Sequence, residues 1–321
     1  MKILTILIFS GDRLNVNNLL NDISKLNKKS FQVVIVEWGK KKEFLKKKKL
    51  IYSSFKDKIK NFKVIYQTGT WEYKYSKFID KFNSKYILVL GDDDRLNLIH
   101  FNKIFKFLEK EYSGITLSFA NIGEKQSLKQ TNYKSSAIRP FNLFKDINRI
   151  GYTSCQIINV KFIKELTNLD KSYLLKTMFP QNFLILKIIQ KYSNWKILEL
   201  KCIWNQLAIF NNKWIKKYLL LRLKSEYLGY FLPVKIYFSN LNSHQVKKIY
   251  KRVFFKNIIS WIFLSTKYHG KKKTFKMINN VRDTLKEPIE IKIFLYLFKI
   301  TPLYLINILR IIRKNILNND K

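Results

Sequence analysis

Cysteine, glycine, proline and histidine are all scarce in this chain, and each scarcity argues against a class of structure. The two cysteines, Cys155 and Cys202, are far apart and form no CxxC pair, which argues against a zinc site or a disulfide framework. Only 9 glycines and 5 prolines occur in 321 residues, so a collagen-like or low-complexity chain is disfavoured. The three histidines are isolated from one another, and we expect structural or surface positions for them.

Long uninterrupted apolar runs are also missing. The opening segment MKILTILIFSGDR has an apolar stretch of only about 7 residues before Asp12 and Arg13, so it is interpreted as a buried strand and not as a signal peptide. The apolar stretch at 290–316 contains interior charges and a proline, whereas a membrane-spanning helix needs about 20 consecutive apolar residues. We therefore expect a cytoplasmic protein.

Acidic residues are few beside basic ones. The chain has 62 Lys+Arg against 22 Asp+Glu, which gives a formal charge of +40. Such a balance predicts an anionic partner, namely nucleic acid, an anionic membrane face or a phosphorylated substrate. An AT-rich coding sequence, which favours Lys, Ile, Asn, Phe and Tyr, explains part of the excess. Arginine is sparse. Because arginine recognises bases and phosphates better than lysine does, its scarcity disfavours nucleic acid as the partner.

The apolar pattern of the first half predicts an α/β fold. Buried strands are expected at 3–9, 31–38, 61–67 and 86–90, with helices at 15–26, 73–84 and 97–111 and a charged helix or loop at 40–59. Strands without polar alternation that are separated by helices indicate a mostly parallel sheet with flanking helices. The segments SGDR, EWGK and GDDDR follow three of these strands, and we expect them to converge on one crevice.

The pattern changes after residue 112. Strands are expected within 114–123 and 194–207, a loop, strand and helix within 147–166, and a helix at 178–192. From residue 212 onward the chain is predicted to form helices rich in Lys, Ile, Leu, Phe and Tyr. We therefore divide the chain into regions 1–112, 113–211 and 212–321.

Asp92, Asp93 and Asp94 are consecutive carboxylates at the end of the fourth predicted strand. Adjacent carboxylates repel one another, and a hard divalent cation such as Mg²⁺ or Mn²⁺ would relieve that repulsion while bridging diphosphate oxygens. The alternative interpretation is a solvated acidic turn or a helix N-cap, because aspartate is favoured there and a helix is predicted to follow.

These motifs together resemble the inverting, family-two nucleotide-sugar glycosyltransferases with the GT-A fold. ILIFSGDR stands where that family has a strand followed by Pro-Thr-Tyr-Asn-Arg, and Ser10 and Arg13 keep the character of its Thr and Arg. VIVEWGK stands where the family has Val-Val-Asp-Asp-Gly-Ser, with Glu37 and Trp38 in place of the two acids. YILVLGDDDRL resembles the metal-binding DxD motif in the Gly-Asp-Asp-Asp form of bacterial O-antigen and deoxysugar transferases. INRIGYTSCQIINVKFI, at 147–163, resembles the acceptor-side segment.

The resemblance covers roughly residues 1–210 and implies a set of roles. It implies a GT-A fold with a nucleotide-sugar half at 1–112, an acceptor half at 113–211 and a basic helical C-terminal region. The implied activity is metal-assisted, inverting transfer of a hexosyl or deoxyhexosyl group from a nucleotide-diphosphate donor to a glycan or lipid-linked acceptor in surface polysaccharide synthesis. The implied donor-binding residues are Ser10, Arg13, Glu37, Trp38, Lys77 and Asp92, with Arg95 as a further cation, and the implied metal ligands are Asp92, Asp93 and Asp94. The family's general base is an acid on the acceptor side, but TMFPQNF at 177–183 has no carboxylate, and the nearest candidates are Asp170, which we select, and Asp146. The alternatives are a surface role or a helix cap for these two residues, with an acid of the Asp92–Asp94 run as the base.

The C-terminal third has two interpretations that are mutually compatible. KKKTFK at 271–276 and the stretch at 290–316 predict an amphipathic basic surface on an anionic inner leaflet, which would make the protein peripheral at the plasma membrane. They are equally consistent with an ordinary helical subdomain. Two competing functions are a basic nucleic-acid-binding protein and a catalytically silent, membrane-associated protein with the transferase fold. No nucleic-acid motif is present, so we expect no nucleic-acid partner.

Overall fold

The computed structural model describes residues 2–26, 30–121, 135–137, 153–177, 179–192, 194–205, 212–239, 241–282, 288–302 and 305. The chain divides into two compact units. The first comprises Met1–Asn142 and Arg149–Ile209, and the second comprises Leu143–Asn148 and Phe210–Lys321.

The first unit is built on one sheet, and the four strands from the N-terminal part of the chain pair in parallel. These strands are β1 (Lys2–Ser10), β2 (Phe31–Glu37), β3 (Phe62–Tyr66) and β4 (Ser84–Gly91), in the order β3-β2-β1-β4. The apolar runs of β1, β2 and β4 are almost wholly buried, as expected for strands covered on both faces. All four strands were predicted from the sequence.

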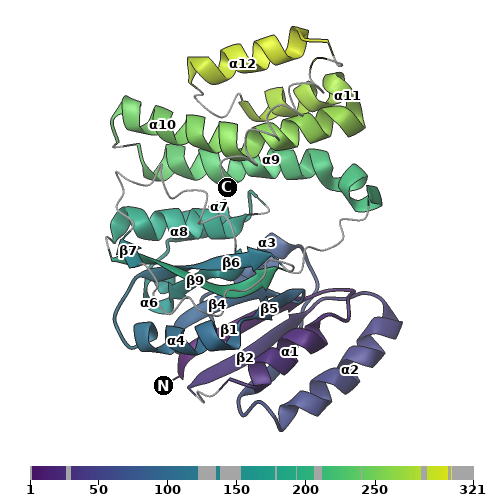
Figure 1. Cartoon of the computed structure of the whole chain (residues 1–321), viewed down its shortest axis with the longest axis vertical. Helices are drawn as coiled ribbons and strands as arrows, with labels where there is room; N and C mark the ends of the chain where they lie inside the picture. Colours follow the sequence, from purple (N-terminus) through teal and green to yellow (C-terminus); the bar gives the residue numbers. More distant parts are fainter. Residues whose placement is uncertain are drawn as a thin grey trace. The chain divides into compact units, whose positions relative to one another are not determined.

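Helices lie on both faces of this sheet (Figure 1). Side chains of α1 (Val16–Ser24), α2 (Lys42–Lys56) and α4 (Leu98–Leu108) form a core with alternate residues of β1 and β2, such as Ile8 and Ile35. On the other face, α3 (Trp71–Phe78) places Trp71 against Phe9, with ring centroids 4.6 Å apart. The alternation of side chains along each strand therefore explains how one apolar run serves two helical layers.

The second half of the sheet is mixed. Its strands are β5 (Asp94–Leu96), β6 (Gly114–Asn121), β7 (Ser135–Ala137), β8 (Gln156–Asn159) and β9 (Trp195–Asn205). The order continues from β4 as β8-β6-β9-β5, with β7 beside β9. Among the described strands of this half, β6 and β9 alone pair in parallel, while β8 is antiparallel to both of its neighbours. The 3-10 helix η2 (Thr153–Cys155) and helices α6 (Val160–Lys164), α7 (Asn168–Leu174) and α8 (Pro180–Lys191) complete this half.

The second unit is helical in its described residues, as the sequence predicted. It contains α9 (Asn212–Tyr237), α10 (Ser243–Val253), the π-helix η3 (Phe254–Ile258), α11 (Ile259–Arg282) and α12 (Ile289–Ile300). Gly270, at φ 77°, kinks α11 in the left-handed region that glycine tolerates. Aromatic side chains such as Tyr227, Phe231 and Phe254 fill its core. Within the described part of the chain, every helix is too short or too polar to cross a membrane.

Candidate functional site

The carboxyl ends of β1, β2 and β4 lie side by side. Ser10 is in register with Glu37, and Phe9 is in register with Gly91. The hydroxyl of Ser10 donates to Asp92 Oδ2 at 3.2 Å, and the Gly11 amide donates to the same oxygen at 3.0 Å. The expectation that the turns after these strands converge is therefore confirmed for SGDR, EWGK and GDDDR.

Arg13 bridges the first two acids of the triplet. Its Nη2 lies 2.7 Å from Asp92 Oδ1, and its Nη1 donates to Asp93 Oδ2 at 2.7 Å. Asp92 is fully buried, and burial raises the pKa of its carboxyl against the opposing effects of Arg13 and the Gly11 amide. Burial alone would lower the pKa of Arg13, but the two carboxylates outweigh it and raise that pKa. A guanidinium ion thus relieves the repulsion between Asp92 and Asp93.

Asp94 is stabilised by neutral donors instead. Its Oδ2 accepts hydrogen bonds from the Gly91 amide, at 2.6 Å, and from the Ser154 hydroxyl. Burial raises the pKa of its carboxyl to about 7. A Cβ at position 91 would lie 2.8 Å from Asp93 Oδ1, so glycine is the residue that leaves room for the Asp93 carboxylate in this turn.

The three carboxylates point in different directions, which decides how they could hold a metal. Asp92 faces the turn after β1, Asp94 faces Gly91 and Ser154, and Asp93 keeps 19% of its side chain exposed. The described residues contain no cluster of three or more metal-ligating side chains. Mg²⁺ and similar ions bind commonly through one or two carboxylates, with substrate phosphates and water as the remaining ligands. The site fits that mode, with Asp93 as the accessible ligand.

Glu37 belongs to a buried cluster with Lys48 and Tyr52 beneath the turn after β1. Lys48 Nζ donates to Glu37 Oε2 at 2.9 Å, to Ser10 Oγ at 2.7 Å and to the Gly11 carbonyl. The Tyr52 hydroxyl donates to the same Glu37 oxygen, and burial followed by that hydrogen bond raises the pKa of Tyr52. The side chains of Lys48 and Glu37 are 1% and 0% exposed. The carboxylate of Glu37 is therefore engaged inside the protein, where it ties β2 to β1.

Trp38 lies at the surface beside this cluster and is 39% exposed. The Lys74 ammonium lies 3.7 Å from the centroid of its ring and donates to the Gly69 carbonyl at 2.8 Å. A Cβ at Gly11 would come within 3.0 Å of the indole, so the Trp38 ring also packs closely on the turn after β1. Burial lowers the pKa of Lys74 to about 8. Trp38 thus presents part of an aromatic surface next to the strand ends.

The remaining predicted residues make other contacts. Lys77 donates to Gln67 Oε1 at 2.5 Å, and Arg95 forms a two-point ion pair with Asp22 of α1 at 2.6 and 2.8 Å. Asp170 forms a capping box with Thr167 at the start of α7, and its Oδ1 lies 3.7 Å from Lys187 Nζ. Asp146 lies outside the described residues.

Sequence reasoning missed Lys48, Tyr52 and Ser154. A signal for the first two was present, because Lys48, Tyr52 and Phe55 recur at i, i+4 and i+7 and so share one face of α2. The run of lysines around position 48 hid that pattern. The sequence indicated Ser154 only as part of the acceptor-side segment 147–163, because its proximity to Asp94 depends on where η2 and β8 join the sheet.

Comparisons with known proteins relate this chain to solved structures alone. No protein-family model and no curated protein matches it. The structure of S. aureus TarS 1-349 in complex with UDP-GlcNAc superposes with a TM-score of 0.67 at 14% identity, over 89% of this chain and 82% of that one. A mannosyltransferase from Pyrobaculum calidifontis in complex with GDP-Man and Mn²⁺ superposes with a TM-score of 0.54 at 7% identity, over 92% and 84%.

The chain has the GT-A fold. At these identities the likeness concerns the fold alone. In GT-A terms, the parallel strands β3-β2-β1-β4 form the first half of the sheet, and the Asp92–Asp94 turn lies at the end of β4. The expected fold class is thereby confirmed.

Proposed function

We propose that this GT-A protein is a glycosyltransferase that moves a hexosyl or deoxyhexosyl group from a nucleotide-diphosphate donor to a glycan or lipid-linked acceptor in surface polysaccharide synthesis, with inversion. The observation that carries the proposal is the pairing of Arg13 with Asp93 at the edge where three strand ends converge. A guanidinium and an accessible carboxylate side by side suit a diphosphate and its divalent cation.

Each residue of the strand-end site has a proposed role. A divalent ion, Mg²⁺ or Mn²⁺, held through Asp93 would stabilise charge on the departing diphosphate. Arg13 lies beside Asp93 and would add a charge-assisted contact to the same phosphates. Ser10 and Asp92, which are hydrogen-bonded to each other, would line the buried side of the site, and Glu37 would hold the end of β2 in place through Lys48. Trp38 offers its exposed edge to the nucleobase.

The donor is tested by thermal stabilisation. We expect one class among UDP-, GDP-, CDP- and dTDP-sugars to raise the melting temperature in the presence of Mn²⁺ or Mg²⁺, and the Asp93→Asn variant to lose that response. Asp57→Asn, an exposed acid at the end of α2, is the matched control and should respond like the natural protein. A response that persists in Asp93→Asn, or no response to any class, would contradict the proposal.

Asp170 is proposed as the general base that deprotonates the acceptor hydroxyl. Asp170 also takes part in a capping box, so a substitution there affects stability, and that effect must be distinguished from an effect on turnover. Asp170→Asn should lower turnover at least about a hundredfold if the carboxylate is the base. Thr167→Ala, which disrupts the same cap at a loss of about 1 kcal/mol, should leave turnover nearly unchanged. Equal losses of turnover in both variants would assign Asp170 to the cap alone.

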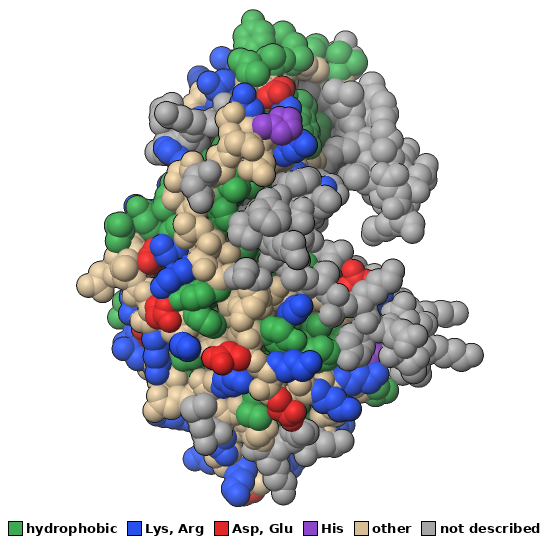
Figure 2. Space-filling view, turned by 90° about the vertical axis from the view of Figure 1, so that its left-hand side faces the viewer, with side chains coloured by type: hydrophobic (Ala, Val, Ile, Leu, Met, Phe, Trp, Pro, Cys, Tyr) green, Lys and Arg blue, Asp and Glu red, His purple; other side chains and the backbone are tan. Residues whose placement is uncertain are grey.

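The second unit supports a peripheral position on the cytoplasmic face of an anionic membrane. The outer face of α12 exposes large apolar side chains together with two exposed lysines, Lys292 and Lys299, and Figure 2 shows hydrophobic side chains gathered over this helix. The apolar residues are Ile289, Ile293, Tyr296, Leu297 and Ile300. Exposed apolar area flanked by lysine fits an interface with anionic lipid. Ile293→Asn combined with Leu297→Asn should abolish co-sedimentation with phosphatidylserine vesicles, and unchanged sedimentation would refute this assignment.

A further inference from the structure

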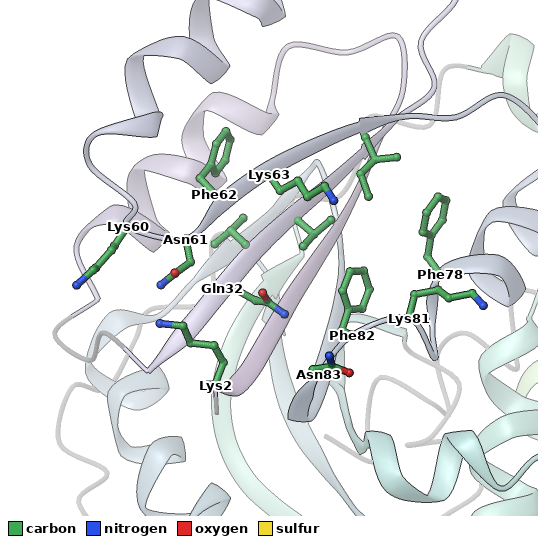
Figure 3. Close-up of a pocket in the computed structure, with 13 residues that line it drawn as sticks. Lys2, Gln32, Lys60, Asn61, Phe62, Lys63, Phe78, Lys81, Phe82 and Asn83 are labelled. Carbon is green, nitrogen blue, oxygen red and sulfur yellow. The ribbon is translucent and has the colours of Figure 1, made fainter.

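A cavity of about 580 Å³ opens on the first unit, away from the strand-end site. Figure 3 shows it on one face of the sheet formed by β1, β2 and β3, bounded on one side by the end of α3 and the chain that follows. Lys2, Gln32, Asn61 and Asn83 place it towards the amino-terminal ends of the strands. The lining extends from these residues to Ile65 near the end of β3, and Gln32 lies about 16 Å along β2 from Glu37, so most of the cavity lies towards the other end of the sheet from the donor site.

The alternation of side chains explains why this face is open. Val33 and Ile35 point into the core shared with α1, whereas Gln32 and Val34 point to the cavity. Lys63 of β3 is in register with Val34 and lines the same face. Helix α3 is short and ends at Phe78, so it leaves the start of β2 and β3 uncovered. A sheet face that a longer helix would normally cover is here accessible to a ligand.

The cavity is positively charged without local compensation. Four lysines line it, Lys2, Lys60, Lys63 and Lys81, and none of the lining residues that the structure describes is acidic. None of the four forms an ion pair with a carboxylate in the described part of the chain, in contrast to Lys48, Lys171 and Lys191 elsewhere in this unit. Like charges gathered around a concave surface raise the local potential, and an anionic ligand lowers it.

The shape of the cavity indicates an extended ligand. Figure 3 shows the four lysine side chains spread apart instead of converging on one point, which suits several separated anionic groups better than a single phosphate. Between them lie Phe78 and Phe82, which offer apolar surface to the part of a ligand that connects its charges. Lysine acts as a point charge and imposes no planar, two-point geometry, so it suits carboxylates and phosphates alike.

We propose that this cavity binds an anionic segment of a glycan chain, with its carboxylate or phosphate groups on the lysines and its sugar rings on the phenylalanines. The choice of a glycan over other polyanions rests on the proposed glycosyltransferase function. A second contact remote from the reacting end would hold a polymeric substrate near the donor site and raise its effective concentration there.

The experiment compares two lysine-to-glutamine variants. In the first, Lys2, Lys60, Lys63 and Lys81 are all changed to Gln; in the control, the exposed α2 lysines 42, 46, 47 and 49 are changed to Gln, which removes the same charge from the opposite face of the sheet. Binding of an oligogalacturonate and of inorganic tripolyphosphate is measured by fluorescence anisotropy competition at two salt concentrations. A neutral maltooligosaccharide of equal length and a single-stranded oligonucleotide serve as further probes.

We expect the cavity variant to bind oligogalacturonate at least about tenfold more weakly with a reduced salt dependence, because fewer counterions are released, and the control to change by less than about threefold. Equal losses in both variants, or equal binding of the neutral glycan, would overturn the proposal. Tighter binding of the oligonucleotide with the same dependence on the four lysines would assign the cavity to nucleic acid. The nucleotide-sugar response is measured on the same samples, so its absence would refute the proposed function without affecting the glycan result.

Discussion

Lys48 is the residue whose removal most directly tests how the strand ends are held together. Its side chain is 1% exposed, and its ammonium contacts Glu37, Ser10 and the Gly11 carbonyl, so Lys48 joins the end of β1 to the end of β2. Lys48→Met keeps most of the side-chain volume and removes the charge. Glu37 would then be a buried carboxylate with the Tyr52 hydroxyl and a backbone amide as donors but without a cation.

The expected loss follows from that uncompensated charge. Breaking a buried ion pair by removing one partner costs about 3–5 kcal/mol, because the remaining charge stays desolvated. For a folded unit of this size each 1 kcal/mol lowers the melting temperature by about 2–4 °C, so a fall of roughly 10 °C is expected. Adding Glu37→Gln to Lys48→Met removes the uncompensated buried charge and should recover at least about half of the lost stability.

Melting is followed by circular dichroism for the natural protein, Lys48→Met, the double variant and Lys49→Met, whose side chain is exposed on the same helix. Lys49→Met should melt within about 2 °C of the natural protein, as surface substitutions generally do. A Lys48→Met protein that melts like the Lys49→Met control would refute the assignment of a buried pair. So would a double variant that is less stable than Lys48→Met.

Two further substitutions probe the neighbouring turns. Gly91→Ala places a Cβ 2.8 Å from Asp93 Oδ1, so it should displace that carboxylate. We expect the metal-dependent nucleotide affinity, measured by titration calorimetry, to fall at least about tenfold. The free energy of unfolding, measured by chemical denaturation, should fall by less than about 1 kcal/mol. Burial lowers the pKa of Lys74 to about 8, so protonating this amine costs more free energy in the folded state than in the unfolded state. The folded protein avoids this cost above the amine's ordinary pKa and bears it in full once the pH has fallen through 8. Lys74→Met should therefore gain about 1–2 kcal/mol relative to the natural protein between pH 10.5 and pH 7, allowing for solvent screening, and a pH-independent difference would contradict this. Trp38 fluorescence should titrate near pH 8 in the natural protein alone.

The strands of the first half were predictable because burial on both faces leaves continuous apolar runs. Strand positions 3–9, 31–38, 61–67 and 86–90 needed only that pattern, and the convergence of their carboxyl ends followed from parallel pairing. The order of the second half was not predictable. The antiparallel β8 pairs between β4 and β6 through contacts distant in sequence, and no periodicity encodes such an order.

The candidate site was predictable in its acids and not in their partners. The Asp92–Asp94 triplet was prominent because acids are rare in this chain, and the sequence prediction that a cation lies among them was made for a metal. The structure places Arg13 between Asp92 and Asp93 and neutral donors on Asp94. Which cation neutralises an acid depends on the path of the turn after β1, and that path is set by tertiary contacts.

A metal ion bound through Asp93, as proposed, would compete with Arg13 for that carboxylate, and this competition would set the order of binding events at the proposed site. With Arg13 Nη1 2.7 Å from Asp93 Oδ2, an ion arriving with a diphosphate would displace the guanidinium from Asp93 and release it towards the phosphates. Arg13→Gln should therefore bind Mn²⁺ alone roughly tenfold more tightly, because a neighbouring positive charge is removed, and bind the nucleotide-sugar complex more weakly, because a phosphate contact is lost. Titration calorimetry with Mn²⁺ alone and then with the nucleotide sugar separates the two effects. Affinities that change in the same direction would show that Arg13 and the metal do not share Asp93.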